Sequence, residues 1–120
     1  MKALAVLALL TFALLAGCSS MPPAPTVLTP QADGSYLIHM AGTRFVPANA
    51  QVPVGANVTW VNDESVGHDV TAMDGSFSSG GVANLQKGKT YTHQFTVAGT
   101  IEYHCEAHHG LGMEGVLHVG

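Results

Sequence analysis

Basic residues, cysteines and long apolar stretches are all scarce in this 120-residue chain. Lysine and arginine number 4 against 8 aspartate and glutamate residues, and the formal net charge of −4 excludes a nucleic-acid binder that needs a basic patch. Two cysteines are too few for a disulfide-rich mini-protein, and the length leaves room for one domain. Histidine is abundant by contrast, since four of the seven histidines fall between His104 and His118. We therefore expect the chemistry of the chain near its C-terminus.

The first 17 residues have the pattern of an export signal. Lys2 precedes Ala3–Leu15, an uncharged stretch of thirteen residues that suits a signal peptide and is too short to span about 30 Å of hydrocarbon. Leu15-Ala16-Gly17-Cys18 resembles the bacterial lipobox, in which the peptide is cut before a lipidated cysteine. We predict a lipoprotein signal peptide at residues 1–17 and lipidation of Cys18; an ordinary secretory signal and an uncleaved anchor are the alternatives. The protein would then lie outside the cytoplasm on a bacterial membrane, the outer one if the host has two, since Ser19 follows the cysteine.

A proline-rich segment separates this predicted anchor from the rest of the chain. Ser19–Pro30 contains four prolines and no charge, so residues 18–32 are expected to be an extended tether or a disordered N-terminus. The folded domain is expected at residues 33–120. With Cys18 lipidated, Cys105 remains the single free thiol, which excludes a disulfide.

The predicted domain shows short β-branched and aromatic runs between turn residues, and no sustained helical periodicity. Val58, Trp60 and Asn62, for example, share one face of a strand. The expected strands are Tyr36–Met40, Gln51–Val54, Asn57–Asn62, His68–Ala72, Thr90–Thr96, Thr100–Cys105 and Gly115–Val119. Seven to eight short strands at this spacing predict an all-β, Greek-key β-sandwich.

Metal-binding side chains gather in the segment Tyr103–Met113, which holds a thiol, imidazoles and a thioether. A further histidine, His68, lies far upstream at the head of a predicted strand. A thiolate, two imidazoles and a thioether are the ligand set of a mononuclear blue-copper site. Thiolate and thioether favour Cu(I), whereas imidazole suits both oxidation states, so the pattern indicates a redox-active copper centre.

From about Thr43 to Val119 the chain resembles the plastocyanin-like cupredoxins. The loop Cys-x2-His-x4-Met has the plastocyanin spacing, Ala98–Cys105 is similar to the family's approach to the copper, and Gly67-His68-Asp69-Val70 resembles its Gly-His-Asn-Val element. The resemblance implies a cupredoxin-like fold and one type 1 copper per chain. The ligands that it implies are His68, Cys105, His108 and Met113.

Asp69 departs from the family pattern, which usually has asparagine after the upstream histidine. An ionised carboxylate only accepts hydrogen bonds, so we expect the side-chain tie between two loops to be weakened here. A carboxylate near the metal also favours Cu(II), which predicts a lower reduction potential than in an Asp69→Asn variant.

Each predicted ligand has a simpler alternative. Cys105 could be a buried structural thiol, His68 an ordinary loop histidine, and Met113 a core residue, since methionine packs adaptably. His108 and His109 compete for one position, and spacing and the family pattern favour His108. His104 must point to the face of its strand opposite Cys105. The remaining histidines, within strands, are expected to be satisfied or exposed: His39, His93 and His118.

These features predict a carrier of single electrons between redox partners outside the cytoplasm, without enzymatic activity, small-molecule substrate or nucleic-acid partner. The acidic charge predicts a partner with a basic docking face, and the chain is expected to be a monomer. The alternative is a membrane-anchored protein for copper storage, delivery or resistance, to which His104 and His109 lend support. A zinc site and a purely structural lipoprotein are two further hypotheses, and Met113 argues against zinc.

Overall fold

The computed structural model describes residues 21–120, so the predicted signal peptide and Cys18 lie outside the described residues. Within that range the chain forms nine strands and two short 3-10 helices. The strands are β1 Thr26–Val27, β2 Tyr36–Met40, β3 Phe45–Val46, β4 Asn49–Val52, β5 Ala56–Asn62, β6 Thr71–Ala72, β7 Thr90–Phe95, β8 Gly99–His104 and β9 Glu114–Val119. The 3-10 helices are η1 Val82–Asn84 and η2 Glu106–Leu111.

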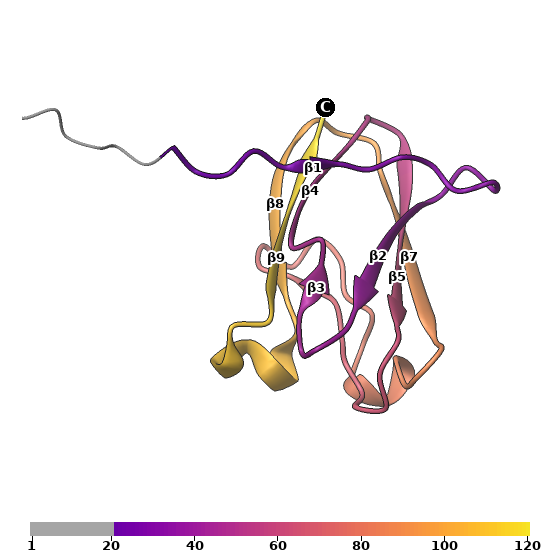
Figure 1. The fold of residues 1–120 in the computed structure, drawn as a ribbon, viewed down its shortest axis with the longest axis vertical. Coiled ribbons are helices and arrows are strands. Elements are labelled where there is room, and N and C mark those ends of the chain that lie inside the picture. The colour runs from indigo at the N-terminus through magenta and orange to yellow at the C-terminus, as the bar shows by residue number, and fades with distance from the viewer. Residues whose placement is uncertain (1–20) are drawn as a thin grey trace, which may run out of the picture.

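The strands form two sheets that face each other, which confirms the predicted β-sandwich (Figure 1). One sheet has the order β1-β4-β9-β8-β6, and the other has the order β3-β2-β5-β7. Both sheets are mixed, because β2 pairs in parallel with β5 and β4 pairs in parallel with β9. The loops that carry η1 and η2 lie together at the end of the sandwich opposite the C-terminus (Figure 1).

Every second side chain along a strand points inward, and these side chains fill the space between the two sheets. Val58, Trp60 and Asn62 of β5 are all fully buried, as the period-2 pattern predicts. The Trp60 ring packs at 5.3 Å from the ring centroid of Tyr103 on β8, so an aromatic contact joins the two sheets. Tyr103 leads directly into the metal-binding loop, and the core therefore fixes where that loop begins.

The predicted strand over His68–Ala72 is shorter in the structure, because only β6 pairs as a strand. The preceding backbone N–H groups have other partners: that of Asp69 points to Cys105 Sγ, and that of Val70 donates to Ser79 Oγ. A ladder cannot form where its donors are already used. The chain here is held as a loop that bends around the cysteine.

β1 and β3 are two further strands, and they raise the count above the seven to eight expected. β1 pairs in parallel with β4, and Asn49 Nδ2 donates to the carbonyl of Pro23. Part of the proline-rich segment is thus hydrogen-bonded along the edge of a sheet. In residues 21–120 no helix has the length and apolar character needed to cross a membrane.

Candidate metal centre

Three of the predicted ligands lie side by side at the loop end of the sandwich. His68 comes from the loop before β6, Cys105 follows β8, and His108 lies in η2. One donor atom from each lies within 4.8 Å of the other two. The Cys105 Sγ atom is 3.4 Å from His108 Nδ1 and 3.9 Å from His68 Nδ1, and the two Nδ1 atoms are 3.1 Å apart. We call this group the His–Cys–His cluster.

The loop between β8 and β9 closes over the cluster. Cys105 N–H donates to the Met113 carbonyl at 3.1 Å, and Met113 N–H donates to the His108 carbonyl at 3.3 Å. Gly112 makes the turn with φ of 80°, a left-handed conformation that suits glycine. Met113 is fully buried where this loop enters β9, and its role as an axial thioether ligand stays a prediction.

Glu64 orients His68. The Nε2 atom of His68 lies 2.5 Å from Glu64 Oε1, and because a carboxylate only accepts, Nε2 carries the proton. The Nδ1 atom, which faces Cys105 and His108, is thereby left as the free electron-pair donor. A histidine that donates its other N–H to a carboxylate is the usual arrangement at metal sites.

Glu64 is itself fixed by the loop between β2 and β3. It accepts hydrogen bonds from the backbone N–H groups of Gly42 and Thr43 at 2.8 and 2.9 Å. Burial alone would raise the pKa of Glu64, but the hydrogen bonds from Thr43, His68 and Gly42 outweigh it and hold this pKa below its usual value. Glu64 was not predicted from the sequence to be part of the site, although its position four residues before His68 could have indicated a contact with that histidine.

Asp69 keeps the tie between loops that its replacement of asparagine was expected to weaken. Its carboxylate accepts the Glu106 N–H at 3.0 Å and the Thr71 hydroxyl at 2.8 Å. The expectation was wrong because both partners are donors, so an acceptor without N–H groups is sufficient. Asp69 is only 3% exposed, and it joins the loop before β6 to the start of η2.

Cys105 is fully buried and has no disulfide partner among residues 21–120. Burial raises the pKa of its thiol; the Asp69 N–H lowers it and the Asp69 carboxylate raises it further. A buried neutral thiol beside two imidazoles becomes a thiolate when it binds a metal ion.

The donor set fits copper. The cluster supplies one imidazole from the loop before β6, and a thiolate and a second imidazole from the loop between β8 and β9. With a thioether from buried Met113 this would be the combination of soft and borderline donors that copper takes in blue-copper sites. Glu64 holds the ring of His68, and backbone hydrogen bonds hold the loop that carries Cys105, His108 and Met113, so the arrangement is formed by the fold.

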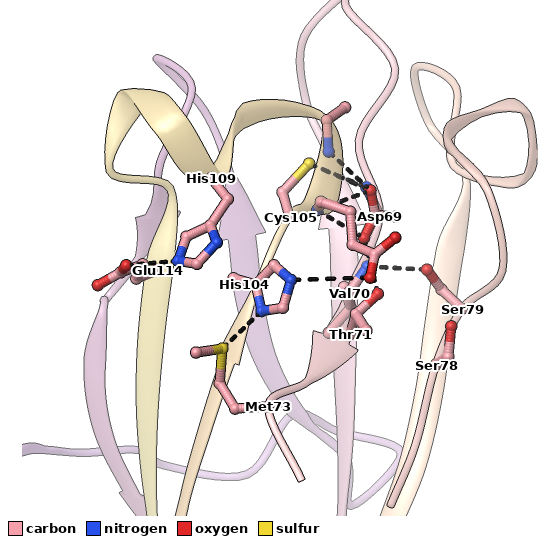
Figure 2. Close-up of polar contacts among 12 residues, drawn as sticks. Asp69, Val70, Thr71, Met73, Ser78, Ser79, His104, Cys105, His109 and Glu114 are labelled. Atoms are coloured by element: carbon pink, nitrogen blue, oxygen red, sulfur yellow. Dashed lines mark hydrogen bonds and ion pairs between the residues drawn. The ribbon is translucent and has the colours of Figure 1, made fainter. Parts of the chain in front are cut away.

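The other histidines lie outside this cluster. His109 turns away from Cys105 and its Nε2 atom lies 2.7 Å from Glu114 Oε1, while His104 contacts Met73 on the opposite face of β8, as strand alternation predicts (Figure 2). His39 lies beside Asp63, and His118 lies beside Asn49. His93 packs between aromatic rings.

A β-sandwich with a buried His–Cys–His cluster at one end defines the class of the cupredoxins. A family model described as copper binding proteins of the plastocyanin/azurin family matches residues 33–120. The chain belongs to this family, as its resemblance predicted, and copper is its cofactor.

Proteins of two kinds have sequences similar to that of this chain. Amicyanin of Paracoccus denitrificans is 33% identical over 79 residues, which are 64% of this chain and 60% of that protein. Plastocyanin of Scenedesmus fuscus is 32% identical over 83 residues, 62% of this chain and 85% of the plastocyanin. The matched part thus spans less than two thirds of that amicyanin but most of the plastocyanin.

Solved structures share the fold. A mutant of amicyanin in the reduced state has a TM-score of 0.62 and 32% identity, covering 75% of this chain and 86% of that one. A purple cupredoxin of Nitrosopumilus maritimus has a TM-score of 0.57 and 26% identity, and the match covers 70% of this chain and 98% of that one. A copper-containing nitrite reductase of Thermus scotoductus has a TM-score of 0.60 and 25% identity, but only 24% of its chain is matched.

Proposed function

We propose that this protein carries single electrons between redox proteins outside the cytoplasm, through one type 1 copper held by His68, Cys105, His108 and Met113. The observation that supports the proposal most directly is the geometry of the His–Cys–His cluster. Its donor atoms are close together, and its members come from two loops that hydrogen bonds hold in place. A centre built in this way changes little when an electron arrives or leaves, which is what fast transfer requires.

Copper, when bound, supplies the one-electron Cu(II)/Cu(I) chemistry. The residues of the chain hold the ligands in place: Glu64 fixes the ring of His68, and the Asp69 N–H is directed at the Cys105 sulfur. His108 is half-buried, whereas His68 is fully buried, so the His108 ring edge is the shortest way from the centre to the surface. Leu111, 75% exposed in the same loop, gives that exit an apolar surface for brief docking of a partner.

Charge supports a partner with a basic docking face. The described residues 21–120 include all eight acidic residues of the chain but only three of its basic ones. Glu106 and Glu114, both largely exposed, flank the loop that carries His108. Association is then accelerated by electrostatic attraction and slows as salt is added.

Lipidation at Cys18 would anchor the protein to the outer face of a bacterial membrane, with the segment before β1 as the tether. This part of the proposal rests on the lipobox resemblance alone. Incorporation of labelled palmitate into the wild-type chain, and its loss in Cys18→Ser, is the result expected. Equal labelling of both chains would contradict the anchor.

A second candidate function is copper storage or delivery. It is favoured by the imidazoles of His104 and His109, which stack at 4.3 Å between ring centroids beside the centre. An enzymatic role is disfavoured because four protein ligands leave no open position on the metal for a substrate.

Visible absorption and EPR during titration with Cu(II) test the main proposal. An intense thiolate band at one equivalent, lost with ascorbate and regained in air without loss of copper, is the expected result. His108→Ala should remove or shift the band, and His109→Ala should retain it. A colourless complex, or one from which a chelator easily removes the copper, would overturn the proposal of an electron carrier. It would favour copper storage or delivery instead.

A further inference from the structure

A second group of metal-binding side chains lies outside the His–Cys–His cluster, on the outer side of the sheet formed by β8 and β9 (Figure 2). It comprises Met73 after β6, His104 at the end of β8, His109 in η2 and Glu114 at the start of β9. We call it the surface His–Met cluster. In the proposed electron transfer none of these residues binds the copper of the buried centre, and only Glu114 has a part, as one of the acidic residues that attract a partner.

His109 is held as a metal-binding histidine would be. Its Nε2 atom lies 2.7 Å from Glu114 Oε1, and because the carboxylate only accepts, Nε2 carries the proton. Its Nδ1 atom is left as the free donor, and in Figure 2 this second nitrogen lies on the side of the ring toward His104. Glu64 and His68 repeat the same carboxylate–histidine arrangement in the buried centre.

His104 lies between His109 and Met73 and contacts both. The two imidazole rings stack with centroids 4.3 Å apart and an interplanar angle of 25°. His104 Nδ1 lies 2.7 Å from the sulfur of Met73, which is itself 52% exposed. The His104 side chain is only 13% exposed, so its ring is fixed by packing while His109 covers it from outside.

The surroundings favour a cation. Met73 and Glu114 line an open hollow of about 710 Å³ on this face of the sheet. Its other ionisable lining residues are Glu102, Tyr103 and His118, and no lysine or arginine of residues 21–120 lines it. His104 and His109 lie outside its lining. Glu106 Oε1 lies 3.9 Å from His104 Nε2 and adds a further negative charge next to the cluster.

We propose that the surface His–Met cluster binds a second copper ion, with His104, His109 and Met73 as ligands and Glu114 as the residue that orients His109. Two imidazoles suit both oxidation states of copper, and an exposed thioether favours Cu(I). The site is separate from the buried centre, because His104 and Cys105 are consecutive and point to opposite faces. Its exposure makes the ion exchangeable with the solvent or with another copper protein.

The test uses the detergent-solubilised full-length protein already loaded with one equivalent of copper. A second equivalent of Cu(II) should give a new EPR signal without an intense thiolate band. His109→Gln and Glu114→Gln should each weaken binding of this second ion, the latter by about tenfold or more, since removal of an orienting carboxylate has an effect of that size. His118→Gln, a histidine of the same hollow bonded to Asn49, is the matched control and should change nothing.

Cu(I) provides an independent readout. Competition with the chelator bicinchoninate should show that Met73→Leu weakens the second Cu(I) and leaves the second Cu(II) nearly unchanged. Absence of a second equivalent, or binding that is equal in wild type and the His104→Gln/His109→Gln double variant, would overturn the proposal. The thiolate band reports the buried centre throughout, so failure of the second site is distinguishable from failure of the first.

Discussion

Asp69 contacts the sulfur of Cys105 with both its backbone and its side chain. The Asp69 N–H points to Cys105 Sγ at 3.4 Å, and the carboxylate oxygen Oδ2 lies 3.4 Å from the same sulfur. The N–H stabilises a thiolate, whereas the carboxylate repels it. In the thiol state the S–H donates to Oδ2; in a copper-bound thiolate that hydrogen bond is gone and the two negative groups face each other.

The Asp69→Asn variant should therefore have a higher reduction potential than the wild type. The negative carboxylate stabilises Cu(II) over Cu(I), and its removal should raise the potential by on the order of 50–100 mV. Asparagine Oδ1 still accepts the Glu106 N–H, so the loops stay tied. Cyclic voltammetry of the two proteins measures the difference, and an unchanged or lower potential in the variant would contradict the argument.

Loss of Glu64 should weaken copper binding although Glu64 is not expected to touch the metal. Glu64→Ala frees the His68 ring and leaves the N–H groups of Gly42 and Thr43 without their partner. We expect copper affinity to fall about 10–100-fold, as for other residues that orient a metal-binding histidine. Chelator competition measures this change. Asp63→Ala, which removes the contact with His39 instead, is the matched control, and an equal loss in both variants would contradict a specific role.

The strands that the sequence predicts well are those with enough residues to show alternation. β2 has the expected bounds, Tyr36–Met40, and β5 buries every second residue from Ala56 to Asn62. β1 and β3 contain two residues each, too few for a period to be visible. The shortened β6 could not be foreseen either, because the donors of Asp69 and Val70 are used by Cys105 and Ser79, which are distant in sequence.

The sequence predicts those residues of the candidate centre that lie close to one another along the chain. Cys105, His108 and Met113 lie in one loop, and the preceding strand sets their order. Glu64 and the surface His–Met cluster depend on tertiary contacts: Met73 and His104 are 31 residues apart in sequence. Strand alternation predicted that His104 faces away from Cys105, but not which side chain it meets there.

Copper uptake should release a proton from Cys105. Burial raises the pKa of this thiol, so it is neutral in the metal-free protein at neutral pH and must lose its proton to bind copper. Apparent copper affinity should then rise by about tenfold per pH unit between roughly pH 7 and 8, as the thiol proton becomes easier to remove. Isothermal titration in buffers of different ionisation enthalpy counts the protons released. A pH-independent affinity would show that the thiolate is already formed.

Gly115 on β9 should tolerate no side chain, because a β-carbon there would overlap the ring of Tyr103. Tyr103 is only 1% exposed and is held between Phe45 and Trp60, with ring centroids at 4.7 and 5.3 Å, so it has no room to move. Gly115→Ala should lower the free energy of unfolding by about 1–3 kcal/mol, the usual cost of overpacking.

Gly110 provides the matched control for that substitution. A β-carbon at Gly110 meets no atom within 4 Å, so Gly110→Ala should leave stability nearly unchanged although it lies closer to His108 in sequence. Urea unfolding of both variants gives the free energies. Tyr103 leads into Cys105, so Gly115→Ala should also shift the copper–thiolate band, whereas Gly110→Ala should not. Equal stabilities would mean that the core adapts around Tyr103, and the position of Cys105 would then depend on its loop contacts with Asp69 and Met113 more than on the packing beneath it.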